Sequence, residues 1–211
     1  MPSPGRSIAD LDPAGTYTYA DYLTWQLTEW VELLRGKLTR RMSSAPADVH
    51  QAAVGELHGL LHQYLRRKPC KVRVAPYDVR LIKSGSRLPA AADAAIHTVV
   101  QPDLCVICDP TKIDKRGCNG APDWVIEVLS PGTVHRDTRE KYDLYQEAGV
   151  GEYWLVAPGE QSITAYVLDA ATNRYQLAGE YGGPGRIPCA TLPALVVEWA
   201  EVFPEEEEGT G

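Results

Sequence analysis

Two apolar segments, residues 99–107 and 124–129, constrain this chain more than any other feature of its sequence. A strand that is exposed on one side alternates apolar and polar residues, whereas these segments are nearly continuous in apolar residues. They therefore predict two strands in the middle of a sheet that is covered on both faces. The chain has 211 residues, 44% of them hydrophobic and 23% charged, which is typical of one globular domain with a full core.

The rest of the chain alternates between helical and strand patterns. A stripe of apolar residues at i, i+3 and i+4 predicts a helix over residues 49–67, and a second helix is expected over 136–148, closed by Gly149. Aromatic residues from Tyr19 onwards indicate a further helix, followed by a small hairpin whose first arm carries Glu32. Additional strands are expected at 71–83, with an irregularity near its middle, and at 153–157, 162–168, 174–180 and 191–198. This order predicts a mixed α/β (α+β) domain in which helices cover a central sheet.

The two ends of the chain differ from its middle. Residues 1–18 are polar and rich in Pro and Gly, so we expect a flexible leader, and residues 204–211 carry four consecutive glutamates, so we expect an acidic disordered tail. Residues 19–203 then form a single domain. The chain contains no apolar run of the ~20 residues that cross a bilayer, so neither export nor membrane insertion is expected.

The cysteines predict a reducing compartment, the cytoplasm. There are five of them, an odd number without regular spacing, in a chain large enough to fold without disulfides. Cys105 and Cys108 form a CxxC inside a predicted strand, where an odd separation directs the two side chains to opposite faces. This geometry disfavours a zinc site that would combine them with Cys118, because such a site needs four convergent ligands. We expect free thiols.

The balance of charge limits how the chain can bind nucleic acid. Lys and Arg number 21 against 28 Asp and Glu, a formal charge of −7, which disfavours binding through bulk positive charge. The densest group of basic residues is Arg66, Arg67, Lys68 and Lys71, which would contact phosphates or form a solvated helix end. A metal-dependent nuclease is not excluded, because it needs carboxylates at the scissile phosphate and the metal reverses the local field.

Asp103 and Glu127 are anomalous because they lie within the two apolar segments. A carboxylate on a central strand loses several kcal/mol of solvation unless it is paired or holds a metal. Two acids on neighbouring strands supply the minimum that Mg²⁺ needs, the remaining ligands being waters and phosphate oxygens. The alternatives are a buried ion pair or a strand edge that is open to water. A lysine would assist a metal-activated water, and Lys141 is the candidate.

The segments around these acids resemble the Uma-two family of bacterial restriction endonuclease-like proteins, which belongs to the PD-(D/E)xK nuclease superfamily. The resemblance covers about residues 19–166 and rests on an ordered set of motifs rather than on any one of them. These motifs are Val31-Glu32-Leu33-Leu34-Arg35-Gly36-Lys37-Leu38, His50, Ala75-Pro76-Tyr77-Asp78-Val79-Arg80-Leu81, Gln101-Pro102-Asp103-Leu104, residues 121–131, Asp137, Lys141, Tyr145 and residues 149–156.

The resemblance implies a restriction-endonuclease-like fold, a mixed central sheet flanked by helices, with Asp103 and Glu127 as metal ligands. In the superfamily a lysine follows two residues after the second acid, but here that position is Leu129. The family implies that the lysine has moved to the next helix, where Lys141 matches. Asp137 lies four residues before Lys141 on the same helical face, an arrangement that a plain surface ion pair would also produce.

Glu32 and His50 also match family positions, which makes them candidates for a second shell or a further metal site. The expected function is a Mg²⁺- or Mn²⁺-dependent endonuclease that hydrolyses DNA. We expect a homodimer, since two active sites are the simplest way to cut both strands. Two alternatives remain: a catalytically silent module with the nuclease fold that binds nucleic acid or protein, signalled by Leu129, and a partner-binding protein with a buried ion-pair network and no metal.

Overall fold

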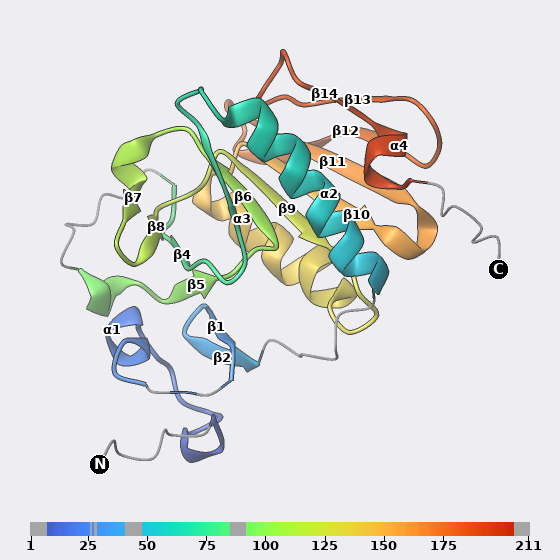
Figure 1. The fold of residues 1–211 in the computed structure, drawn as a ribbon. Helices are drawn as coiled ribbons and strands as arrows, with labels where there is room; N and C mark the ends of the chain where they lie inside the picture. Colours follow the sequence, from blue (N-terminus) through green and yellow to red (C-terminus); the bar gives the residue numbers. More distant parts are fainter. Residues whose placement is uncertain (1–7, 26, 28, 41–47, 85–91, 205–211) are drawn as a thin grey trace.

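The computed structural model describes residues 8–25, 27, 29–40, 48–84 and 92–204. Residues 1–7 of the expected leader and the glutamates at 205–208 of the expected tail lie outside this part. The described chain forms two six-stranded sheets and a small two-stranded sheet, with helices packed against them (Figure 1).

The central sheet contains both acid-bearing segments. Its strand order is β12-β11-β10-β9-β6-β3, and β9 and β10 are parallel while every other pair is antiparallel. Its strands are β3 (Lys71–Val74), β6 (Leu104–Ile107), β9 (Trp124–Val128), β10 (Glu152–Ala157), β11 (Ser162–Asp169) and β12 (Arg174–Tyr181). Residues 104–107 and 124–128, within the predicted segments 99–107 and 124–129, form neighbouring, fully buried strands, so the prediction of central strands is confirmed for these parts.

A second sheet has the order β2-β1-β5-β4-β8-β7. Its strands are β1 (Val31–Leu34), β2 (Lys37–Arg40), β4 (Val79–Leu81), β5 (Thr98–Val100), β7 (Ile113–Asp114) and β8 (Gly117–Asn119). The prediction of one strand over residues 99–107 is therefore wrong, since β5 and β6 belong to different sheets. Pro102 lies between them, and because proline has no N–H to donate to a ladder, the pairing stops there and the chain crosses over. Residues 71–83 are divided in the same way between β3 and β4.

Helices cover the two faces of the central sheet. Helix α2 (Asp48–Leu65) buries Leu57 and Leu61 against the face that carries Trp124 and Ile126. The π-helical turn η4 (Arg136–Lys141) continues into α3 (Tyr142–Ala148), which packs against the opposite face and ends where Gly149 takes a φ of 86°, a conformation that favours glycine. Both predicted helices are confirmed. No helix among the described residues is long and apolar enough to cross a membrane.

Short elements complete the described fold. The helix expected from Tyr19 is only α1 (Tyr19–Tyr22), followed by the predicted hairpin β1–β2. Near the other end, β13 (Arg186–Pro188) pairs with β14 (Val196–Glu198), and α4 (Trp199–Val202) joins the core beneath α2. The remaining helices are 3₁₀ turns at Ile8–Asp10 (η1), Asp93–Ala95 (η2), Pro110–Lys112 (η3) and Pro158–Glu160 (η5).

The cysteines correct one expectation. Cys70 and Cys108 form a disulfide rather than two free thiols. The register of β3 and β6 pairs Lys71 with Ile107, so the next pair outward is Cys70 with Cys108. Such a cross-strand pairing depends on register, which cysteine spacing alone does not reveal. The other three cysteines, Cys105, Cys118 and Cys189, are free and buried, and burial raises the pKa of the Cys118 and Cys189 thiols to about 12.

Candidate active site

The antiparallel pairing of β6 and β9 brings Asp103 and Glu127 together. Leu104 pairs with Ile126, so Asp103, one residue before β6, stands opposite Glu127. The backbone N–H of Val128 donates a hydrogen bond of 2.8 Å to Asp103 Oδ2, and the N–H of Asp103 donates one of 3.4 Å to Glu127 Oε2. Each carboxylate is therefore fixed by the backbone of the other segment, and both are buried.

Lys141 projects from the π-helical turn η4 into this pair of acids. Its Nζ lies 2.9 Å from Glu127 Oε1, 3.1 Å from Glu32 Oε1 and 3.7 Å from Asp137 Oδ1. Lys141 and Asp137 are both buried, so they are not the surface ion pair that the sequence also allowed. Leu129, which occupies the position of the superfamily lysine, packs instead with the core beneath α3. An ammonium thus reaches the acids from the helix.

Glu32 comes from the second sheet, on β1. Its side chain is fully buried, and its Oε1 accepts a hydrogen bond of 2.7 Å from the backbone N–H of Gln101, in the crossing between the sheets. Its Oε2 lies 4.0 Å from Arg136 Nη1 and accepts no hydrogen bond from the described residues. The two sheets are therefore joined at the acid cluster.

Two further side chains bound this cluster. His50, in the first turn of α2, places Nε2 at 3.5 Å from Asp103 Oδ2. Tyr145 donates a hydrogen bond of 2.6 Å from its hydroxyl to Glu127 Oε1. The sequence analysis included Tyr145 only among the motif residues and did not predict this contact. The available signal was spacing, because Tyr145 follows Lys141 by four residues and so shares its helical face.

Crowding of acids dominates the electrostatics of the site. Glu32, Asp103, Glu127 and Asp137 are each at most 5% exposed. Burial raises the pKa of Glu127 to about 8; Lys141 opposes this shift, while Asp137, Asp103 and Glu32 add to it. Burial likewise raises the pKa of Asp137, against the effect of Lys141. Additional positive charge at this point would stabilise the ionised carboxylates.

The donor atoms suit a hard divalent cation. Mg²⁺ and Mn²⁺ prefer oxygen ligands and keep several waters, so two carboxylates are sufficient. Asp103 and Glu127 supply these, and Oε2 of Glu32 is a buried oxygen that no described hydrogen bond occupies. Within the described ranges no three His, Cys, Asp or Glu residues are arranged as a ready-made metal site. An ion bound here would therefore complete its shell with water or substrate oxygens.

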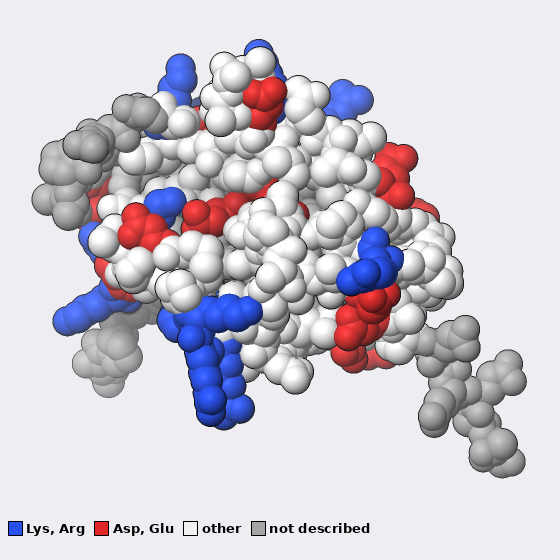
Figure 2. All heavy atoms as spheres, turned by 90° about the horizontal axis from the view of Figure 1, so that it is seen from above, with Lys and Arg blue, Asp and Glu red and all other residues white. Residues whose placement is uncertain are grey.

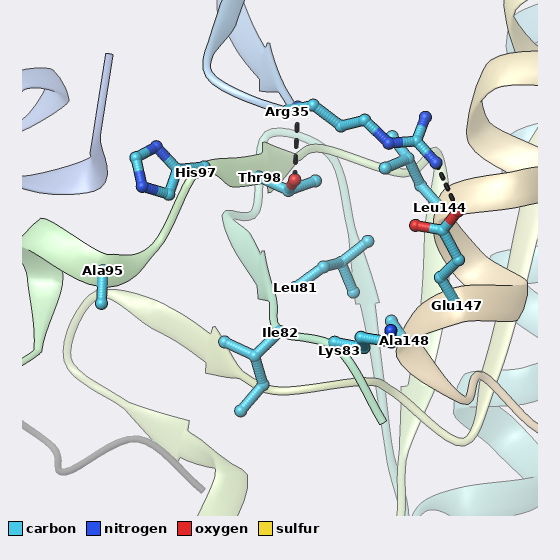
Figure 3. Close-up of a pocket in the computed structure, with 10 residues that line it drawn as sticks. All are labelled: Arg35, Leu81, Ile82, Lys83, Ala95, His97, Thr98, Leu144, Glu147 and Ala148. Carbon is cyan, nitrogen blue, oxygen red and sulfur yellow. Dashed lines mark hydrogen bonds and ion pairs between the residues drawn. The ribbon is translucent and has the colours of Figure 1, made fainter. Parts of the chain in front are cut away.

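A pocket of about 310 Å³ lies at the other end of α3 and is separate from the acids (Figure 3). Its wall includes Leu81, Thr98 and Leu144, and an ion pair of 2.5 Å joins Arg35 Nη2 to Glu147 Oε1 across its edge. None of the clustered acids lines it. The pocket is therefore not part of the candidate site.

Basic side chains gather at the far end of α2 from His50. Lys and Arg project from the face of the molecule in Figure 2, and the four residues at this helix end, Arg66, Arg67, Lys68 and Lys71, are all exposed. A helix rises about 1.5 Å per residue, so roughly 24 Å of helix separate Arg66 from His50. This group is too distant to contact a phosphate that lies at the acid cluster.

Comparisons with known proteins identify a family and a similar fold. A family model described as "Uma2: Putative restriction endonuclease" matches residues 19–200. The fold is similar to the crystal structure of a putative nuclease belonging to DUF820 from Anabaena variabilis, with a TM-score of 0.67 and 18% sequence identity over 88% of this chain and 97% of that chain. No curated protein matches the sequence. The predicted restriction-endonuclease-like fold is confirmed.

Proposed function

The chain belongs to the Uma2 family of putative restriction endonucleases, and from this premise we propose that it is a Mg²⁺- or Mn²⁺-dependent endonuclease that hydrolyses DNA. The observation that carries the proposal is the contact of 2.9 Å between Lys141 Nζ and Glu127, beside Asp103 on the neighbouring segment. In metal-assisted phosphodiester hydrolysis two acids can hold the ion, and a lysine can stabilise the charge that develops on the phosphate.

Asp103 and Glu127 would hold the ion. When bound, a divalent ion neutralises charge on the phosphate and lowers the pKa of a coordinated water. The backbone N–H groups of Val128 and Asp103 keep the two carboxylates oriented before any ligand arrives. Tyr145 donates to Glu127 Oε1 and so fixes which oxygen of Glu127 faces Lys141.

Lys141 would stabilise the negative charge that develops on the phosphate and orient the attacking water. Glu32 and Asp137 hold its ammonium group from two further directions. Such preorganisation matters because a group that is already in place does not reorganise during the reaction. His50 contacts Asp103 and is placed to position that carboxylate. We propose that His50 acts through Asp103, and that Glu32 and Asp137 act through Lys141, without reacting themselves.

The decisive test combines metal binding with cleavage. Plasmid and single-stranded DNA are incubated with the protein in Mg²⁺, Mn²⁺ or EDTA, and Mn²⁺ binding is measured by calorimetry. Asp103→Ala should abolish both cleavage and Mn²⁺ binding. Asp143→Ala, which removes an exposed acid on α3, is the matched control and should change neither. Mn²⁺ binding that survives Asp103→Ala at the parental affinity would disprove the assignment.

Leu129 favours a second candidate function, a catalytically silent module that binds nucleic acid. It removes the lysine from its usual strand position, and a lineage that had lost catalysis would tolerate such a change. A parent protein that binds Mn²⁺ and DNA but cuts no nucleic acid would support this reading. We further propose that the active form is a homodimer, which sedimentation in the presence of duplex DNA would test.

A further inference from the structure

Three exposed apolar residues lie close in the sequence to residues of the acid cluster. Six large hydrophobic residues of the described chain are exposed, and three of them, Trp30, Val49 and Val134, come one or two residues before a residue of the site. Trp30 lies two residues before Glu32, Val49 lies next to His50, and Val134 lies two residues before Arg136. Consecutive Cα atoms are about 3.8 Å apart, so each apolar side chain starts within about 8 Å of a cluster residue along the chain.

Trp30 is the most unusual of these residues. It is 53% exposed, whereas Trp124 and Trp154 are fully buried, Trp199 is 9% exposed, and Trp25 packs against two tyrosine rings. The indole of Trp30 makes no ring contact or side-chain hydrogen bond with the residues that the structure describes. Trp30 directly precedes β1, and residues two apart in extended chain share a face, so a continuation of the strand would place Trp30 on the side of Glu32, about 7 Å farther along.

From this placement we propose that Trp30 is a stacking platform for a nucleobase next to the scissile phosphate, and that the preferred substrate is nucleic acid with unstacked bases, such as a single strand. The inference rests on the proposed nuclease function and adds the substrate class. A phosphate held at Asp103, Glu127 and Lys141 would place its attached nucleoside within reach of the indole.

Physical reasons favour a nucleobase over a second copy of the chain. A base offers a flat π-face of about the size of an indole, and base–aromatic stacking contributes to binding for every base. Bases inside a duplex are already stacked on each other, so only an unpaired strand presents this face. A stable protein interface instead needs a contiguous patch, about 800 Å² on each partner, whereas Val49 and Val134 are next to exposed or half-buried polar residues such as Asp48 and His135.

The test measures binding of oligo(dT) and of a duplex of equal length, in Ca²⁺ without Mg²⁺, by anisotropy of labelled DNA and by tryptophan emission. Oligo(dT) should quench parental emission. Trp30→Leu should weaken oligo(dT) binding about tenfold, the order expected when one base stack is lost. In separate cleavage assays with Mg²⁺, it should raise KM for single strands without changing kcat. Trp30→Phe keeps an aromatic face, so it should bind within about threefold of the parent while losing most of the quenching.

Leu177→Ala is the matched control, because Leu177 is 57% exposed on β12 and belongs to no part of the acid cluster. It should change neither binding nor quenching. Parental affinity of Trp30→Leu for oligo(dT) would overturn the inference. So would a Trp30→Leu protein that sediments as a monomer when the parent sediments as a dimer, while its affinity for single strands is unchanged. A parent that shows the Trp30-dependent quenching but never cuts would remove the nuclease proposal and leave only the stacking of single strands on Trp30.

Discussion

Glu127 and Glu152 are both buried glutamates on the parallel pair β9 and β10, yet their surroundings are opposite. The register pairs Glu152 with Trp124 at one end of the strands and Leu155 with Glu127 near the other. Glu152 is 1% exposed and Glu127 is 2% exposed, and their side chains point to opposite faces of the sheet. They therefore show two ways in which one sheet keeps a carboxylate out of water.

Neutral donors surround Glu152. It accepts hydrogen bonds of 2.8 Å from Trp154 Nε1, 3.1 Å from the N–H of Ala190 and 2.6 Å from the N–H of Thr191. Fixed donors of this kind satisfy an acid permanently and attach the segment at 190–191 to the sheet. Glu127 instead faces one lysine, one tyrosine and three other acids. The difference indicates that Glu152 stabilises the fold, whereas an added cation would stabilise the ionised form of Glu127.

The largest effect should come from Lys141. Lys141→Met should lower DNA cleavage by two or more orders of magnitude while Mn²⁺ affinity and folding persist, because one preorganised charge is lost from the reaction. Lys141→Arg should not restore the rate, since a planar guanidinium differs from an ammonium in shape and hydration. Single-turnover cleavage of labelled DNA measures both variants. Parental cleavage by Lys141→Met would disprove the role of Lys141 in the reaction, and the contact of Glu127 with this lysine would then have no part in catalysis.

A large loss of stability should follow from Glu152→Ala. The substitution leaves the indole N–H of Trp154 and two backbone N–H groups buried without an acceptor, which should cost roughly 3 kcal/mol of unfolding free energy, or about 6–12 °C in Tm. Thermal and urea unfolding measure this loss, and Mn²⁺ affinity in the folded variant should match that of the parent. A stable Glu152→Ala protein that fails to bind Mn²⁺ would reverse the assignment of the two glutamates.

Glu127→Gln should change the stability in the opposite direction, and only above the pH at which an exposed glutamate ionises. Burial among acids raises the pKa of Glu127 from 4.5 to about 8 in the folded protein. Between these values the unfolded chain binds fewer protons at this group, so its contribution to stability is lost as the pH rises. Without metal, Glu127→Gln should therefore equal the parent near pH 4.5 and become the more stable protein by about pH 8.

The measurement is urea unfolding in EDTA across this pH range. Lys141 keeps two ion pairs, with Glu32 and Asp137, so the substitution does not strand an ammonium. Asp137→Asn is a useful companion, because the pKa of Asp137 is raised in the same direction. If Glu127→Gln is instead less stable than the parent throughout, Glu127 is a structural acid of the same kind as Glu152.

Sequence patterns predicted the elements that hold the site better than the path between them. Helix α2, the strand around Glu127 and the helical face shared by Asp137 and Lys141 follow from periodicity, because each is set by local spacing. The crossing at Pro102 was missed because β5 and β6 are both fully buried, so continuous apolar residues look alike in either sheet.

Contacts that depend on register or on backbone groups were beyond the sequence. Cys70 meets Cys108 only because of the way in which β3 pairs with β6. Glu152 is the first residue of β10, just before the predicted strand 153–157, and gave no signal, since two of its three donors are backbone N–H groups 38 and 39 residues away. The roles of Asp103, Glu127 and Lys141 remain predictions, although the structure brings these three residues into one cluster.

The crossing between the sheets also supplies a spectroscopic reporter. The amide of Gln101 donates to Glu32 Oε1, the oxygen that also contacts Lys141. The backbone amide proton of Gln101 is therefore sensitive to the charge on Glu32 Oε1, an oxygen that links the second sheet to the crossing and to Lys141 on the helix. In a ¹⁵N-resolved NMR spectrum its chemical shift should respond to charge at the site, and its exchange with deuterium should report how often the second sheet separates from the first.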